Sequence, residues 1–162
     1  MRDDERRRGG RRIDLDLLIG AKILFWASLY VYVPVLPIYA RQLGASHGIV
    51  GMVVGAYGLS QLLLRIPIGV ASDHLGRRKP FLVGGMLANA LGCVTMALAP
   101  GPALLVVGRA ILGIGASTYV VSSIYLADFF PRGQIARATS LAVLVSSATQ
   151  VAILLAGGFV GT

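Results

Sequence analysis

Residues 69–80 read GVASDHLGRRKP, a short polar segment. It contains one aspartate between two glycines, and an Arg-Arg-Lys cluster follows the second glycine. The segment joins two apolar runs, Ile49 to Ile68 and Phe81 to Ala99. An α-helix rises about 1.5 Å per residue, so about 20 apolar residues cross the hydrocarbon core of a bilayer. The two runs therefore predict membrane helices, and the segment between them must lie at a membrane face.

The composition of the whole chain points the same way. Of its 162 residues 56% are hydrophobic and only 14% are charged, and the mean hydropathy is +0.75. A soluble domain this apolar would expose large apolar patches and aggregate. We therefore expect an all-α membrane protein with five transmembrane helices, at about 18–40, 48–70, 81–99, 103–126 and 138–160.

The first 17 residues differ from the rest. The start MRDDERRRGGRR is charged, contains glycine and is poor in apolar residues, which predicts a disordered basic tail over 1–17. Residues 18–162 are then the membrane helical bundle. The apolar stretch from Leu15 to Ala40 is too long for the core of a signal peptide, so the first helix is expected to stay in the mature protein.

The basic residues are distributed unevenly along the chain, whose net charge is +8. Only Arg41 falls in a connection expected on the outer side, and Arg65 and Arg109 lie within predicted spans. The other basic residues precede or open the first span, or lie in the second and fourth connections. This pattern predicts a cytoplasmic N-terminus, with Thr162 outside, in an integral protein of the plasma (inner) membrane. It also argues against nucleic acid as a partner.

Residues that could bind a metal or perform catalysis are sparse. Cys93 is the only cysteine, and His47 and His74 lie in predicted loops without a second ligand at metal spacing. No span carries a Ser-His, Cys-His or paired-carboxylate arrangement. The sequence therefore predicts no enzyme, no metal site and no cofactor, and it is compatible with an ion or proton gradient.

Four segments resemble the major facilitator superfamily. The segment at 69–80 is similar to the signature between the family's second and third helices, with Gly69, Asp73, Gly76, Arg77 and Arg78 at its characteristic positions. LLVVGRAILGIGAS resembles the fourth-helix signature, and ADFFPRGQIARATS resembles the connection between helices four and five. YVPVLPIYARQLGAS looks like the end of the first helix in the drug and sugar efflux branches. The resemblance covers about 18–160 and implies the N-terminal half of a major facilitator fold.

The resemblance also implies a role for the polar segment. In the family its aspartate, here Asp73, meets the N-terminal dipole of a helix in the second half of the protein. It also joins a network with the motif arginine and an acid at the end of the fourth helix, a place that Asp128 occupies here. The implied role of Gly69, Asp73, Gly76, Arg77, Arg78 and Asp128 is a conformational latch for the outward-facing state. The alternative is a solvated loop whose arginines only set the topology.

Charged residues inside membrane spans are costly and usually functional. The resemblance places Arg109, which shares a helix face with Gly113, at the central cavity or in proton coupling, and snorkelling to the outer headgroups is the rival interpretation. We expect Arg65 to anchor at the interface and Lys22 to snorkel inward. Weaker substrate candidates, for which packing or interface anchoring fits equally well, are Trp26, Tyr30, Gln61, Tyr119 and Gln150.

The chain departs from the family pattern in two ways. The family has about twelve spans in two halves with the substrate between them, whereas the sequence in hand provides five, so a C-terminal half is the expected partner. Ile153 and Leu154 stand where antiporters of the family carry Gly-Pro, which argues against antiport. We therefore expect secondary active transport of a small molecule across the lipid bilayer by alternating access. The alternative is a truncated, non-transporting membrane protein or assembly partner.

Overall fold

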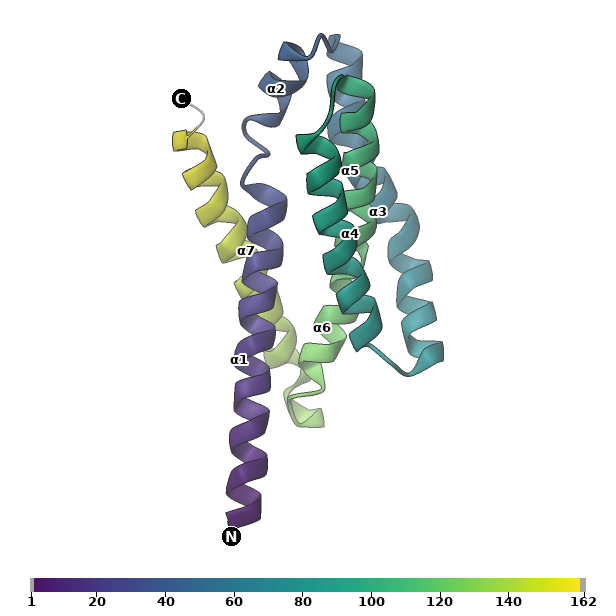
Figure 1. The fold of residues 1–162 in the computed structure, drawn as a ribbon. Helices are drawn as coiled ribbons and strands as arrows, with labels where there is room; N and C mark the ends of the chain where they lie inside the picture. The colour runs from purple at the N-terminus through teal and green to yellow at the C-terminus, as the bar shows by residue number, and fades with distance from the viewer. Residues whose placement is uncertain (1, 161–162) are drawn as a thin grey trace.

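The computed structural model describes residues 2–160, with side chains described for 15–131 and 133–158. Within that range the chain forms helices joined by short turns, and it contains no β-strand. The elements are α1 (Arg2–Tyr30), α2 (Leu36–Gln42), α3 (His47–Leu75), α4 (Lys79–Ala97), α5 (Pro102–Ser117), α6 (Tyr119–Ala127), the 3₁₀ helix η1 (Arg132–Gln134) and α7 (Ile135–Val160). Figure 1 shows an elongated bundle in which α3, α4 and α5 run side by side and α1 crosses α7.

Four stretches of the described chain are long and apolar enough to cross a membrane. They are α3, α4, the combined stretch Pro102–Ala127 of α5 and α6, and Ile135–Gly158 within α7. Each agrees with a predicted span to within a few residues. Large apolar side chains such as Leu62 and Ile66 are exposed on these helices, which a lipid environment accommodates. The prediction of an all-α membrane fold is confirmed.

The first predicted span, 18–40, is interrupted in the structure. α1 ends at Tyr30, residues 31–35 form turns, and α2 begins at Leu36. Pro34 has no backbone N–H, and its ring disfavours a helical conformation of the preceding residue. Neither α1 nor α2 is among the helices of the described chain that are long, apolar and poor enough in charge to cross a membrane. The structure thus shows four candidate spans where the sequence predicts five.

The tail predicted to be disordered over 1–17 is also different. The structure carries α1 back to Arg2, and only Met1 of this segment lies outside the described residues. Once a helix has formed, each added residue gains a hydrogen bond without a new nucleation cost. Arg, Glu and Leu are good helix formers, and Asp3, Asp4 and Glu5 lie where the helix dipole favours negative charge. These local terms favour a helical conformation of the segment, and the disordered tail stays a prediction.

α5 forms the centre of the bundle. It packs extensively against both α3 and α4, and its Leu105, Leu112 and Ala116 are completely buried. The α3–α5 contact depends on Gly113, where a Cβ atom would overlap the carbonyl oxygen of Tyr57 and lie 2.8 Å from the Cβ of Ser60. Such close backbone approach is how membrane helices associate when lipid offers them no hydrophobic drive.

Small residues recur at four-residue spacing in the helices, as at Gly51 and Gly55, but only some of them are used in packing. A Cβ at Gly92 would lie 2.6 Å from the side chain of Leu112, so this position needs glycine. In contrast, a Cβ at Gly51, Gly55 or Gly84 would meet nothing within 4 Å. Spacing alone therefore identifies small residues but not which of them face another helix.

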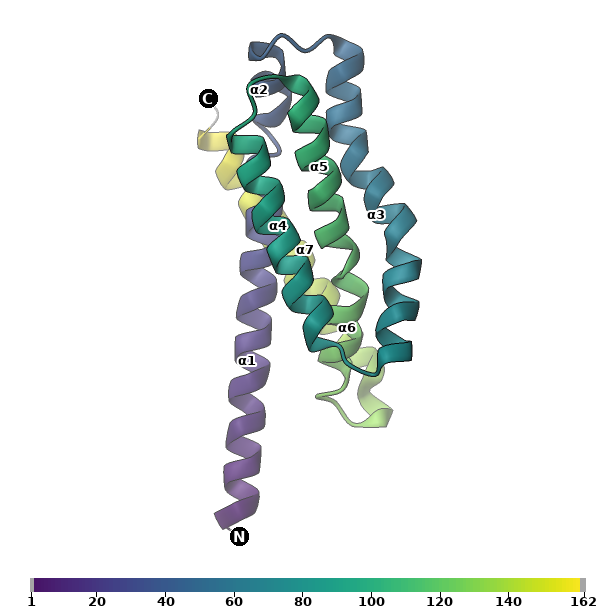
Figure 2. The same cartoon turned by 45° about the vertical axis from the view of Figure 1, so that its right-hand side comes forward.

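The two ends of the bundle differ in their polar content. One end of the bundle, which we call the basic end, contains the start of α1, the end of α3, the start of α4, α6 and η1 (Figures 1 and 2). α2 and the α4–α5 turn lie at the other end. The basic end carries the Arg-Arg-Lys cluster of residues 77–79, whereas Arg41 belongs to the opposite end. The loops that the charge pattern places on one side of the membrane thus share one end of the fold.

Candidate functional site

The polar segment at 69–80 forms the turn from α3 to α4. α3 ends at Leu75 because Gly76 adopts a left-handed conformation, with φ of 60°, and its N–H donates to the carbonyl of Asp73 at 3.2 Å. Glycine reaches this conformation without steric cost. Within the last turns of α3, the hydroxyl of Ser72 donates to the carbonyl of Gly69 at 2.9 Å. The turn leads directly to α4, which begins at Lys79.

An ion pair connects this turn to the end of α6. Arg78 donates from its NH1 atom to the carboxylate of Asp128, and the same atom lies 3.4 Å from the carbonyl oxygen of Ile124. The two side chains are 25% and 55% exposed, so water screens their attraction only in part. The pair joins the first residue before α4 to the first residue after α6, two positions 50 residues apart.

The other residues of the predicted latch lie around this pair. Asp73 contributes to a cavity of about 330 Å³ that Arg78 and Asp128 also line. The carboxylate of Asp73 forms no ion pair within the part of the chain that the structure describes, and Arg77 is exposed. The sequence does not decide which of the neighbouring arginines, Arg77 or Arg78, pairs with the acid. In the structure Arg78 pairs with Asp128.

Arg109 lies deep inside the bundle, with only 5% of its surface exposed. Its Nε donates to the carbonyl oxygen of Val53 at 3.3 Å, and its NH1 donates to the hydroxyl of Tyr32 at 3.3 Å. The guanidinium carbon also lies 4.5 Å from the ring centre of Tyr57. These contacts come from α3 and from the turn after α1. They hold the cation within the chain without any carboxylate, and the sequence did not single out Tyr32 or Tyr57.

Lys22 lies inside the bundle, and the expectation that it snorkels inward to the interface is wrong. It is 4% exposed, and its Nζ donates to the hydroxyl of Ser122 at 2.9 Å. The same atom lies 4.7 Å from the ring centre of Tyr119. The hydroxyl on α6 and the ring beside it provide a local polar site, so the side chain turns to α6 instead of toward the headgroups.

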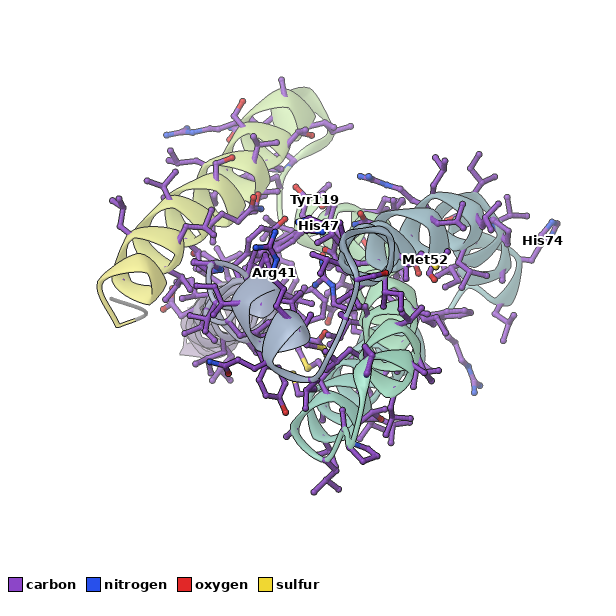
Figure 3. The ribbon with its side chains drawn as sticks, turned by 90° about the horizontal axis from the view of Figure 1, so that it is seen from above. Arg41, His47, Met52, His74 and Tyr119 are labelled. Atoms are coloured by element: carbon purple, nitrogen blue, oxygen red, sulfur yellow. The ribbon has the colours of Figure 1, made fainter. Side chains whose placement is uncertain are left out.

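Three of the weaker substrate candidates form one aromatic cluster. The ring centre of Trp26 lies 5.3 Å from that of Tyr119 and 5.7 Å from that of Tyr30. Seen along the bundle in Figure 3, Tyr119 lies between α7 and α3. The other two candidates, Gln61 on α3 and Gln150 on α7, are half-buried and have no hydrogen bond to another described residue.

Metal-binding groups are not gathered by the fold. Among the described residues no three His, Cys, Asp or Glu side chains approach closely enough to hold an ion. Cys93 is a free, half-buried thiol on α4.

Comparison with known proteins identifies the family. Residues 18–162 match the model of the Major Facilitator Superfamily. The chain belongs to the Major Facilitator Superfamily. The family assignment confirms the resemblance found in the sequence, and with the apolar helices it makes the chain an integral membrane protein.

Several curated members of the superfamily are similar to this chain. The inner membrane transport protein YajR of Escherichia coli is 39% identical over 98 residues, which are 60% of this chain and 21% of that protein. The class C tetracycline resistance protein of Escherichia coli is 31% identical over 150 residues, covering 91% of this chain and 38% of that protein. The multidrug resistance protein MdtH of Aeromonas hydrophila is 31% identical over 151 residues, covering 92% and 38%. The chain thus spans less than two-fifths of the length of these relatives.

Proposed function

We propose that residues 1–162 form the N-terminal part of a major facilitator transporter, which moves a small solute by alternating access together with a C-terminal half. Family membership and the relatives named as transport or resistance proteins support this proposal. The observation that carries the mechanism is the Arg78–Asp128 ion pair at the basic end. It links the α3–α4 turn to the end of α6, and Asp73 lines the same cavity.

The latch works as a bias between two conformations. A half-exposed ion pair contributes about 0.2–1 kcal/mol, and a difference of about 1.4 kcal/mol changes an equilibrium tenfold. The pair can therefore shift the populations of the inward- and outward-facing states without locking either of them. Asp73 has no salt-bridge partner in the described chain, which leaves its charge available to a helix N-terminus of the C-terminal half.

Cysteine accessibility in the complete transporter tests the latch. In a Cys93→Ser background, a cysteine replaces Gln61 and is labelled with an impermeant thiol reagent from either side of the membrane. Asp128→Asn and Arg78→Gln should each change the labelling ratio of the two sides by about 1.5-fold to fivefold. The charge-exchanged double variant, Arg78→Asp with Asp128→Arg, should return the ratio toward that of the parent.

The control for these variants is Arg137→Gln, which removes an exposed cation from the start of α7 at the same end of the bundle. If both latch variants label like the parent and like this control, the pair only sets topology. If labelling at Gln61→Cys never differs between the two sides in any variant, the chain belongs to a non-transporting protein or an assembly partner.

The charge pattern supports an orientation with the basic end in the cytoplasm of a plasma membrane protein. Single cysteines at His74 and Ser46, both exposed at opposite ends of α3, test it. An impermeant reagent should reach His74→Cys from the cytoplasmic side and Ser46→Cys from the outside. Labelling of Ser46→Cys from the cytoplasmic side alone would reverse the proposed orientation.

A further inference from the structure

Two cations approach one aromatic ring at the junction of α1, α3 and α6. The Nζ of Lys22 lies 4.7 Å from the ring centre of Tyr119, and the guanidinium carbon of Arg65 lies 5.7 Å from the same point. Like charges repel, so bringing two cations to one ring has an electrostatic cost. We call Lys22, Arg65, Tyr119, Trp26 and Ser122 the cation cluster.

The cation cluster is rich in hydrogen-bond donors that have no partner. Arg65 forms no ion pair and no hydrogen bond with another described residue, and the same holds for the indole N–H of Trp26 and the hydroxyl of Tyr119. An arginine side chain alone carries five N–H donors. The cluster therefore presents many donors toward a small region.

The one hydroxyl in the cluster that accepts a hydrogen bond is already oriented for that purpose. Ser122 donates its proton to the carbonyl of Tyr119 at 2.8 Å, so its oxygen faces Lys22 as an acceptor. It accepts a hydrogen bond from the Lys22 ammonium at 2.9 Å. An ammonium group has three donors, so this contact leaves two of them for other groups.

No carboxylate that the structure describes forms an ion pair with Lys22 or Arg65. Between residues 17 and 72, and between 74 and 127, the sequence contains no Asp or Glu at all. Burying a cation without a counter-charge is expensive, and Lys22 is 4% exposed. An anion from outside the chain would supply both the missing charge and the missing acceptors.

The space around the cluster fits a small polar group. A cavity of about 30 Å³ is lined by Lys22, Trp26, Tyr119 and Ser122 together with apolar side chains of α1 and α4, and Arg65 is not among its lining residues. The cavity has room for one oxygen atom of an anion and not for a whole solute. Arg65 lies outside this cavity and is exposed on α3, and Figure 3 shows Tyr119 between α3 and α7, so an anion that reaches both cations would have to extend from the cavity toward α3.

We propose that the cation cluster binds the carboxylate or phosphate group of the transported solute, with Lys22 and Arg65 as its two charge partners. This assignment rests on the proposed function, because it names the substrate class of that transporter. The ring of Tyr119, which packs against Trp26, lies beside both cations before the anion arrives. A preordered pair of donors lowers the ordering cost of binding.

A matched set of aromatic probes tests the charge preference. Benzoate, neutral benzamide and inorganic phosphate are titrated into the complete transporter in detergent, and binding is read from the fluorescence of Trp26 as the difference from the Trp26→Phe variant. Trp26 is the only tryptophan of residues 1–162. Benzoate and phosphate should change the emission in a saturable manner, and benzamide should bind about tenfold more weakly than benzoate.

Variants identify the residues responsible. Lys22→Met and Arg65→Met should each weaken benzoate binding about tenfold, whereas Lys22→Arg should stay within about threefold of the parent because the cation is kept. Arg41→Met removes an exposed arginine at the opposite end and should bind benzoate like the parent. Thermal unfolding of each variant shows that it is folded, and the exposed Arg65 provides a test even where a change at buried Lys22 impairs folding.

Three outcomes would overturn the proposal. The first is equal binding of benzoate and benzamide, and the second is parent-like benzoate binding by both methionine variants. The third is a lipid site: in nanodiscs of phosphatidylcholine, added phosphatidylglycerol changes the Trp26 emission in a Lys22-dependent manner while benzoate and phosphate do not.

The binding measurement does not depend on transport. If the probes fail but Asp128→Asn still changes accessibility at Gln61→Cys, the anion site is wrong and the transporter proposal stands. If benzoate binds as expected while accessibility never changes, the site is supported and the alternating-access proposal is wrong.

Discussion

Arg109 and Lys22 are both almost fully buried cations, at 5% and 4% exposure, and neither forms an ion pair with a described carboxylate. Their surroundings differ in how far they satisfy the charge. Arg109 donates to one backbone carbonyl and one tyrosine hydroxyl and lies against the ring of Tyr57. Lys22 donates to one serine hydroxyl and shares an aromatic ring with a second cation.

The difference separates two uses of a buried charge. The Arg109 site takes its acceptors from α3 and from the turn after α1, so its contacts connect three parts of the bundle. The cation cluster around Lys22 instead holds surplus donors and no carboxylate, which stabilises the bundle poorly and suits an incoming anion. Burial of a charge therefore does not define a binding site, and the balance of donors and acceptors around the charge is the better guide.

The largest expected effect on stability is at the contact between α3 and α5, which also holds Arg109 in place. Gly113→Ala would put a methyl group against the carbonyl oxygen of Tyr57, so α5 must move away from α3. Overpacking of this kind costs about 1–3 kcal/mol. Gly55→Ala is the matched control, because its Cβ would meet nothing within 4 Å and alanine favours the helix by about 0.5–1 kcal/mol. Thermal unfolding in detergent should therefore show opposite shifts, and equal stability of the two variants would contradict the packing.

The second effect concerns Arg109 itself. Arg109→Gln removes two hydrogen bonds and the contact of the cation with the ring of Tyr57. Hydrogen bonds within membranes contribute about 0.6 kcal/mol each to stability on average. We expect a loss of about 1–2 kcal/mol in stability and of most transport. Arg109→Lys keeps the charge without the planar fork and should keep partial activity. Parent-like transport by Arg109→Gln would reduce the residue to a structural anchor.

At Lys22 we expect removal of the charge to leave the stability of the fold unchanged or to raise it, in contrast to Arg109. Replacement of buried charges by apolar residues of similar size is often neutral or stabilising, and the Lys22 ammonium has only the Ser122 hydroxyl and an aromatic ring as partners. Lys22→Met should unfold at the same temperature as the parent or higher, while Arg109→Met should unfold at a lower one. If both variants lose stability equally, the comparison between the two sites fails.

The smallest effect separates the two arginines of the polar segment. Arg77 is exposed and has no ion pair among the described residues, whereas Arg78 bonds to Asp128. Arg77→Gln should leave the two-sided labelling of Gln61→Cys unchanged in the complete transporter, and Arg78→Gln should alter it. A larger response from Arg77→Gln would assign the latch to a contact with the C-terminal half.

Much of this molecule follows from local sequence. Apolar runs of about 20 residues predict the spans within α3, α4 and α7, because a span must satisfy its own backbone hydrogen bonds in lipid. The segment at 69–80 predicts both the turn and the family, since glycine, acid and basic residues have fixed places in it. Pro34 indicates the break at residues 31–35. The apolar residues on both sides of it nevertheless favour a single span, which is the prediction from the sequence.

Other features required the packed helices. The sequence shows Lys22, Arg65 and Tyr119 on three separate helices, and only their packing brings both cations to one ring. In the same way, Gly55 and Gly113 look alike in sequence, and only the helix contacts make one of them indispensable. Hydropathy and turn chemistry act between neighbours along the chain, so the sequence determines the membrane helices and their ends. Charge compensation and close packing act between residues distant in sequence, so the tertiary structure alone decides which buried cation is satisfied and which still needs a partner.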